Sequence, residues 1–180
     1  MSMSPEQAAI SLREIEEAQA RSRELRGYRK GSPHLILWGV LWMIAYAATG
    51  LQPRYAAPIW GAAVLTGIVG DTLIGWRPAE LVRSWRYYAT VATLALFVTG
   101  TYLVFAPLRP IQYGAFPPLV VAGVYAALGI WLLPRFLWLG ALLFVLTLGG
   151  FYFLQPWFGF WMAGAGGGCL ILGGWWLRSA

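Results

Sequence analysis

Long apolar runs fill the chain from residue 35 to residue 177, and short breaks containing Pro, Arg or Gln separate them. Each run approaches the ~20 residues that a helix needs to cross a ~30 Å hydrocarbon core. The pattern predicts an all-α, polytopic membrane protein with six spans, at residues 35–51, 56–76, 87–106, 118–133, 137–154 and 158–177.

The fourth and fifth runs meet at Pro134-Arg135 with little else to separate them. A single helix over residues 118–154 would be on the order of 55 Å long at 1.5 Å per residue, too long for one crossing. We therefore expect a tight turn at Pro134, with Arg135 at the membrane surface.

Residues 1–32 form the one sizeable polar segment, and they divide the chain into a cytosolic juxtamembrane part and a six-span bundle over residues 33–178. The capping-box pattern that begins at Ser4-Pro5 predicts a helix from Pro5 to about Gly27. Its thin apolar stripe, Ala8, Leu12 and Ile15, is typical of a solvated helix, and docking to a protein partner is the alternative.

Composition settles the class of protein. Hydrophobic residues make up 59% of the chain and charged residues 11%, against roughly a quarter charged in soluble domains. The chain also contains 11 Trp and 22 Gly, and Trp favours the membrane interface while Gly is commoner in membrane helices than in soluble ones. A water-soluble fold could not bury this much apolar surface.

The basic residues predict the orientation in the membrane. If the N-terminus is in the cytoplasm, 11 of the 13 Lys and Arg residues fall on the cytoplasmic side, and only Arg54 and Arg109 fall on the outer side. Cytoplasmic loops carry the excess of Lys and Arg in such proteins. We therefore expect a bacterial inner-membrane protein with both termini in the cytoplasm.

Five basic residues precede the first span within ten positions: Arg21, Arg23, Arg26, Arg29 and Lys30. Anionic lipids of the inner leaflet are their natural partners, at about 1 kcal/mol per residue near the surface. Nucleic-acid binding would need a basic patch on a soluble module, which the sequence lacks. The sequence therefore predicts contact with lipid headgroups.

Asp71 is the one acid well inside an apolar run, and acids in that position are costly. It shares a helix face with Ala63 and Gly67, so we expect it to face other helices and not lipid. It lies near the cytoplasmic end of its span, within reach of three arginines in the next loop: Arg77, Arg83 and Arg86. A structural salt bridge is the favoured interpretation, and a proton or cation site is the alternative.

The loop that carries these arginines, residues 78–86, has the pattern of a short interfacial helix. His34 follows Pro33 at the inner edge of the first span. Since no carboxylate or second histidine stands near it in the sequence, we expect an interfacial hydrogen-bonding role and no metal or haem ligation.

Small residues at spacings of four mark the last span as a helix-packing face: Gly159, Ala163, Gly164, Gly167 and Gly168. The pattern leaves open whether this face packs within one chain or across a homo-oligomer. Cys169, the single cysteine, excludes an internal disulfide and has the place of a small buried packing residue.

Catalysis has little support in the sequence, because the chain has one histidine and only two acids beyond residue 32. We expect no cofactor and no enzymatic activity. The favoured function is that of a membrane protein acting through lipid or protein contacts. The alternative is a small oligomeric transporter or channel subunit that uses Asp71 as its coupling site.

Both ends of the chain resemble a group of small bacterial membrane proteins of uncharacterised activity. The likeness rests on Leu12-Arg13-Glu14-Ile15-Glu16 with the Arg-rich stretch after it, on Ile36-Leu37-Trp38-Gly39, and on the ending from Leu170 to Arg178. The resemblance implies a multi-span helical fold in a bacterial cytoplasmic membrane. It brings no activity and no binding residue.

Overall fold

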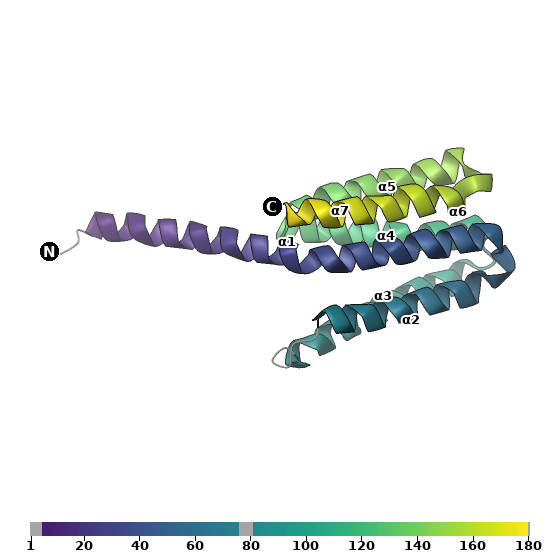
Figure 1. Cartoon of the computed structure of the whole chain (residues 1–180), viewed down its shortest axis with the longest axis horizontal. Helices are drawn as coiled ribbons and strands as arrows, with labels where there is room; N and C mark the ends of the chain where they lie inside the picture. Colours follow the sequence, from purple (N-terminus) through teal and green to yellow (C-terminus); the bar gives the residue numbers. More distant parts are fainter. Residues whose placement is uncertain (1–4, 76–80, 180) are drawn as a thin grey trace.

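The computed structural model describes the backbone of residues 5–75 and 81–179, and side chains for residues 12–75, except 20 and 23, and for residues 92–179. All regular structure in this part of the chain is helical (Figure 1). The helices are α1 (Pro5–Leu51), α2 (Ala56–Gly75), α3 (Leu81–Phe105), α4 (Pro110–Trp131), α5 (Arg135–Phe153), α6 (Phe158–Trp161) and α7 (Gly168–Arg178), with 3-10 turns η1 (Pro53–Tyr55) and η3 (Gln155–Trp157) and a π-helical segment η4 (Met162–Gly167) that joins α6 to α7.

Among the described residues, five stretches are long and apolar enough to cross a membrane: Leu12–Leu51, Pro53–Gly75, Pro110–Trp131, Arg135–Phe153 and Gln155–Arg178. The apolar part of α3, Ala92–Phe105, is shorter. The prediction of an all-α chain with several helices able to span a membrane is therefore confirmed.

Helix α1 is one continuous helix of 47 residues, although the sequence predicted a polar helix ending near Gly27 and a separate span from residue 35. Pro33 lies inside it, where it removes one main-chain hydrogen bond and bends the helix without ending it. Contacts of Gly27 with Leu133 and of Gly31 with Phe136 hold this part of α1 against the bundle. The N-terminal half projects well beyond the other helices (Figure 1).

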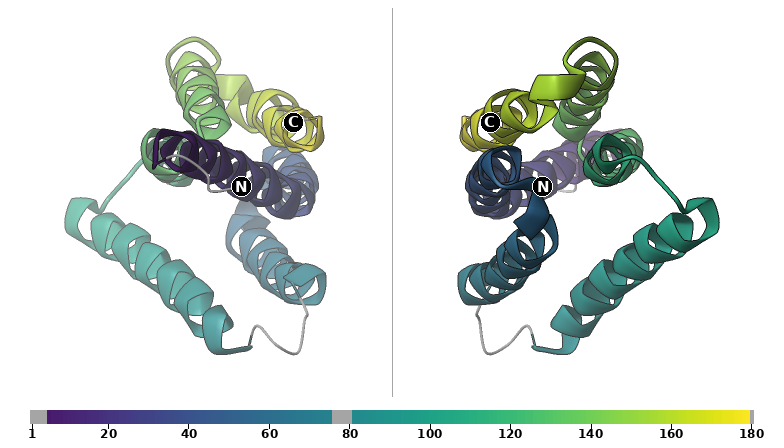
Figure 2. Two further views of the ribbon diagram at one scale, coloured as in Figure 1. Left: turned by 90° about the vertical axis from the view of Figure 1, so that its left-hand side faces the viewer. Right: turned by 90° about the vertical axis from the view of Figure 1, so that its right-hand side faces the viewer.

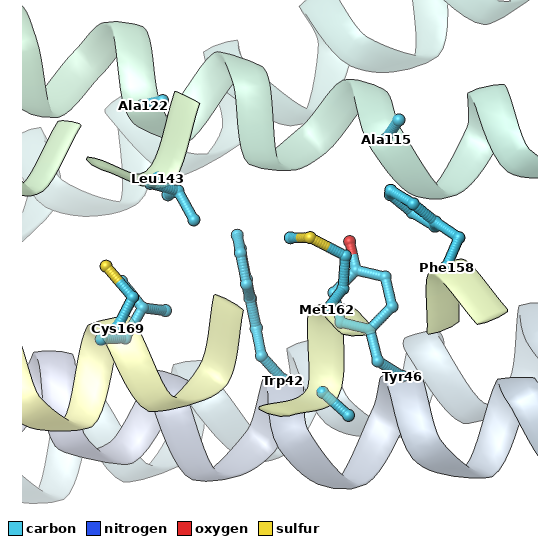
Figure 3. Packing of buried hydrophobic residues seen from close by; sticks show 10 residues of the cluster. Trp42, Tyr46, Ala115, Ala122, Leu143, Phe158, Met162 and Cys169 are labelled. Atoms are coloured by element: carbon cyan, nitrogen blue, oxygen red, sulfur yellow. The ribbon is translucent and has the colours of Figure 1, made fainter. Parts of the chain in front are cut away.

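Helices α1, α4, α5 and the continuous α6–η4–α7 unit form the body of the bundle. Its core is built from side chains of all four: Trp42, Tyr46, Ala115, Ala122, Leu143, Phe158, Met162, Ala163, Cys169 and Leu170 (Figure 3). Tyr46 contacts the rings of Trp42, Trp60 and Phe158 at centroid distances of 5.9, 4.7 and 6.3 Å. Cys169 is buried in this core as a packing residue.

The small residues of the last span face α1 within the same chain. A Cβ atom on Gly167 would lie 2.8 Å from the carbonyl oxygen of Gly39, and one on Gly159 would lie 3.1 Å from that of Tyr46. Ala163 is buried beside them. Gly164 and Gly168, in contrast, have open space where a Cβ would stand. Close backbone approach between α1 and the last span therefore accounts for two of the four predicted packing glycines.

Helix α4 begins at Pro110, eight positions before the predicted start of the fourth span at residue 118, so that predicted start is wrong. Proline at the first position suits a helix start, and the side chain of Gln112 accepts a 2.7 Å hydrogen bond from the backbone N–H of Arg109. Pro117 and Pro118 both lie inside the helix. Their tolerance there depends on two tyrosines from other helices.

Those tyrosines bind the carbonyl groups that the prolines leave without a helical donor. In an α-helix the N–H of residue 117 would bond the carbonyl of Tyr113, and that of residue 118 the carbonyl of Gly114. The Tyr102 hydroxyl of α3 donates to the Tyr113 carbonyl, and the Tyr46 hydroxyl of α1 donates to the Gly114 carbonyl, each at 2.6 Å. Satisfied carbonyls of this kind allow proline inside a membrane helix.

The turn at Pro134 is present as predicted, since α4 ends at Trp131 and α5 begins at Arg135. The backbone of Leu137 approaches Gly129 so closely that a side chain at position 129 would collide with the Leu137 backbone. The glycine therefore lets α5 turn directly back along α4.

Helices α2 and α3 lie on one side of the body of the bundle (Figure 2). Helix α2 packs on α1, where Gly67 and Gly70 receive the side chains of Trp38 and Leu37. Helix α3 meets α4 through aromatic rings near one end, with Tyr102 and Tyr113 at 4.8 Å between centroids. The contact of α2 with α1 forms the surroundings of Asp71.

Candidate functional site

Asp71 lies in the contact between α2 and α1, four positions before the last residue of α2. Gly67, one turn earlier on the same face, has no side chain to keep the two helices apart, so the Trp38 ring lies directly against its backbone. The carboxyl side chain is 3% exposed. The expectation that Asp71 faces other helices is therefore confirmed.

Two side chains of α1 occupy the two carboxylate oxygens. His34 Nδ1 lies 2.6 Å from Oδ1, and the indole Nε1–H of Trp38 donates to Oδ2 at 2.7 Å. His34 and Trp38 are four residues apart and so lie on one face of α1, one turn from each other. The three side chains, which we call the Asp71 cluster, connect α1 with the last two turns of α2.

The cluster limits the cost of placing a carboxyl group in an apolar bundle. The Trp38 N–H is a donor, and the His34 ring nitrogen donates or accepts according to its tautomer. Both oxygens of the carboxyl group therefore have a hydrogen-bond partner on α1. Paired and hydrogen-bonded charges are the ones that proteins bury.

The two partners differ in exposure. The His34 side chain is 34% exposed, whereas that of Asp71 is buried. The imidazole is therefore the part of the cluster that reaches the surface of the bundle, and the carboxyl group lies inside. The arrangement attaches α2 to α1 through a buried acid and a histidine that is partly exposed.

Sequence reasoning missed His34 and Trp38 as partners of Asp71, and the expectation that His34 has no carboxylate neighbour is wrong. The register of the first helical hairpin could have identified Trp38 as a neighbour of Asp71. Trp38 lies 14 residues before Gln52 and Asp71 lies 16 residues after Tyr55, so antiparallel helices joined by this turn place them side by side.

The predicted arginine partners of Asp71 lie outside the described side chains. Arg77 falls in the segment 76–80, which the structure does not describe, and for Arg83 and Arg86 only the backbone of α3 is described. The predicted interfacial helix over residues 78–86 falls partly in the same segment, and α3 begins at Leu81. The salt bridge with these arginines stays a prediction.

The basic residues expected at lipid headgroups lie along α1 where it first meets the bundle. Arg21, Arg26, Arg29 and Lys30 have exposed side chains, and Arg23 is among those whose side chains are not described. Burial raises the pKa of the neighbouring Tyr28 phenol, and the hydrogen bond from Tyr28 to Glu24 raises it further. This stretch is therefore charged on its outer surface and packed on its inner one.

Within the described residues, no group of three or more His, Cys, Asp or Glu side chains could hold a metal ion. Comparison of the chain with protein families, with characterised proteins and with solved structures finds no match.

Proposed function

We propose that the protein is a six-span protein of a bacterial cytoplasmic membrane that acts without catalysis, through contacts made by the projecting part of α1. The observation that carries the proposal is the continuity of α1 from the exposed segment near residue 12 to the core at Trp42 and Tyr46. A partner bound to the projecting segment is thereby connected rigidly to the membrane bundle.

The arrangement of charged ends supports an orientation with both termini in the cytoplasm. The Pro134 turn, the end of α7 and the basic part of α1 lie at one end of the bundle, and η1 with Arg54 and the α3–α4 link with Arg109 lie at the other (Figure 1). The positive-inside rule assigns the first end to the cytoplasm. We assign α3 as the third span, although its apolar part is shorter, because it returns the chain from the end of α2 to the opposite end of the bundle, where α4 begins.

The projecting segment has the size and surface of a docking helix. From residue 5 to the first contact with the bundle, at Gly27, it extends about 33 Å at 1.5 Å per residue. Leu12 and Ile15 lie on one face and are 58% and 52% exposed. Amphipathic helices dock into partner grooves through apolar residues at such spacings.

Site-specific photocrosslinking in cells tests this proposal. A photoreactive residue at Leu12 or Ile15 is expected to give one discrete crosslinked protein, and the same residue at Glu17 or Arg21, on the opposite face, is expected to give none. Deleting residues 1–22, which stops before the Glu24–Tyr28 contact, should abolish binding of that protein while thermal unfolding of the purified bundle is retained. Equal crosslinking from both faces, or none from either, would refute the docking role.

Proton-coupled transport is a second candidate function, favoured by the contact between His34 and the buried Asp71. The test is proton movement into proteoliposomes that contain a pH-sensitive dye and carry an imposed membrane potential. The transport proposal expects movement above that of protein-free vesicles, lost in Asp71→Asn and reduced in His34→Gln, with Glu24→Gln as the matched control. Movement equal to that of empty vesicles would exclude it.

A further inference from the structure

Two arginines from distant parts of the chain are held at the same end of the bundle by α1. Arg135 is the first residue of α5, and Arg178 is the last residue of α7. Each is fixed by a side chain of α1, Tyr28 in one case and Ser32 in the other. Tyr28 and Ser32 are one turn apart, so the two arginines attach to neighbouring positions of one helix face.

The guanidinium group of Arg135 is held between two aromatic rings. Its central carbon lies 5.3 Å from the centroid of the Tyr28 ring and 5.0 Å from that of Trp176. Its Nη1 group donates a 2.7 Å hydrogen bond to the carbonyl of Trp176. A guanidinium has five N–H donors in a rigid plane, so most of them are left for an anion while the plane itself is fixed.

Arg178 is fixed by a buried hydroxyl group. Its Nε–H donates to Ser32 Oγ at 2.8 Å, and the same hydroxyl donates to the carbonyl of Gly174 at 2.6 Å. Ser32 is completely buried, so the side chain of Arg178 leaves the bundle in a defined direction. Its two terminal nitrogens have no hydrogen-bond partner among the described residues.

The charge at this end is positive and largely uncompensated. Neither guanidinium has a carboxylate within ion-pair distance in the described part of the chain, and the nearby Glu24 accepts a hydrogen bond from the Tyr28 hydroxyl. Arg29, the residue after Tyr28, also has an exposed side chain. The two guanidinium groups therefore give the site a positive charge suited to a phosphate group.

Exposed tryptophans give an independent indication that this end lies at headgroup depth. Four of them stand close to the two arginines in the chain, at the end of α4, in the first turn of α5 and in the last turn of α7: Trp131, Trp138, Trp175 and Trp176. Tryptophan gathers at the interface between hydrocarbon and headgroups. Basic pockets between helices on the cytoplasmic side are where anionic lipid headgroups bind.

We propose that Arg135 and Arg178 form a binding site for the phosphate group of an anionic phospholipid of the phosphatidylglycerol or cardiolipin class. The inference rests on the membrane location stated above and not on the docking role of α1. The planar fork of arginine binds phosphate oxygens in pairs. The site differs from the basic stretch over residues 21–30, because its two guanidinium groups are positioned by aromatic rings and a buried hydroxyl.

The alternative is a purely structural role, in which Arg135 caps the Trp176 carbonyl near the end of α7 and Arg178 bonds Ser32 on α1. Removal of a cap lowers stability equally with and without anionic lipid. A lipid site, in contrast, contributes stability in proportion to the lipid that is bound. The dependence on lipid therefore separates the two roles.

Thermal unfolding in a neutral detergent, with phosphatidylglycerol, cardiolipin or phosphatidylcholine added, tests the proposal, and native mass spectrometry reports retained lipid. Anionic lipid should raise the Tm of the wild-type protein and phosphatidylcholine should not. In Arg135→Gln/Arg178→Gln the apparent affinity for anionic lipid should fall by at least about fivefold. The matched control, Arg54→Gln/Arg109→Gln, removes the same charge at the opposite end and should leave it unchanged.

Three outcomes would overturn the proposal: no preference for anionic lipid in the wild type, a preference retained in the Arg135/Arg178 variant, or an equal loss in the control. Inorganic phosphate at millimolar concentration should not stabilise the protein, and stabilisation equal to that by lipid would identify a free-phosphate site instead. If the double variant does not fold, Arg178→Gln alone serves, because this residue is exposed at the end of its helix. Failure here leaves the crosslinking test of the docking helix unaffected.

Discussion

At the scale of single residues, the fold depends on polar side chains that complete what the helices cannot supply themselves. Tyr46 and Tyr102 donate to the two carbonyls that the Pro117-Pro118 pair leaves open. His34 and Trp38 do the same for the carboxylate of Asp71. In an apolar bundle without water, each unmet group costs free energy comparable to a lost hydrogen bond.

The tyrosine–proline relation predicts an unusual double-mutant cycle. Tyr46→Phe should lower the free energy of unfolding of the detergent-solubilised protein by about 1–2 kcal/mol, because the Gly114 carbonyl loses its donor. In a Pro118→Ala background the same change should cost less, since the alanine N–H can bond that carbonyl. The control is Tyr46→Phe combined with Pro117→Ala, which should be additive. An equal cost of Tyr46→Phe in both backgrounds would contradict this explanation.

The Asp71 cluster predicts that changing Asp71 and His34 together costs less than the sum of the two single changes. Asp71→Leu should destabilise the protein by roughly 1.5–3 kcal/mol, because His34 and Trp38 lose their hydrogen-bond partner in the contact between α1 and α2. Adding His34→Leu should cost less than its effect alone, and the cycle gives the coupling energy. Unfolding in detergent measures both.

The same cycle run with Arg77, Arg83 or Arg86 tests the salt bridge predicted from the sequence. Coupling to one of them would add that arginine to the Asp71 cluster. Additivity of Asp71→Leu with His34→Leu would instead show that the contact with His34 contributes nothing to the attachment of α2.

At the scale of the elements, the glycines of the last span separate into two groups by what faces them. Gly167 lies against the backbone of Gly39 on α1, whereas a Cβ atom added to Gly168, the next residue, would have no neighbour within 4 Å. Neighbouring positions of one sequence run thus serve different surfaces. The difference arises because successive residues of a helix point about 100° apart.

This difference predicts opposite results for two adjacent substitutions. Gly167→Ala should destabilise the bundle by about 1–3 kcal/mol, because the new methyl group forces α1 and the last span apart. Gly168→Ala should be neutral or slightly stabilising, since alanine has the higher helix propensity. Thermal unfolding in detergent compares them directly. Loss of an oligomer in Gly164→Ala or Gly168→Ala would instead assign the open glycines to contacts between copies.

At the scale of the whole molecule, the alternation of connections between two ends predicts the membrane topology. In a Cys169→Ala background, which removes the single native thiol, cysteines at Gln52, Arg109 and Gln155 should react with a membrane-impermeant thiol reagent added to intact cells. Cysteines at Arg13 and Ser179 should react only after the membrane is opened. Labelling of Ser179→Cys in intact cells would place the C-terminus outside and remove one span from the proposed topology.

The sequence by itself determined the class of the protein and most of its helices. Apolar runs of span length and the turn signal of Pro134 depend only on local composition, and they predicted helices that the structure contains. The same local reasoning placed Asp71 on a packed face, because a small residue stood one turn away. It misplaced the start of α4. Two adjacent prolines normally predict the end of a helix, and the local sequence shows no donor that could replace their missing hydrogen bonds.

Only the tertiary structure decided which residues meet. The replacement donors for the Pro pair come from Tyr46 and Tyr102, 68 and 11 residues away from the carbonyls they bind. His34 lies 37 residues from Asp71, and Ser32 lies 146 residues from Arg178. Such partners are set by the register and rotation of packed helices, and these depend on the fit of entire helix faces. A helical period indicates which face is buried, but it does not identify the residue on the opposite side.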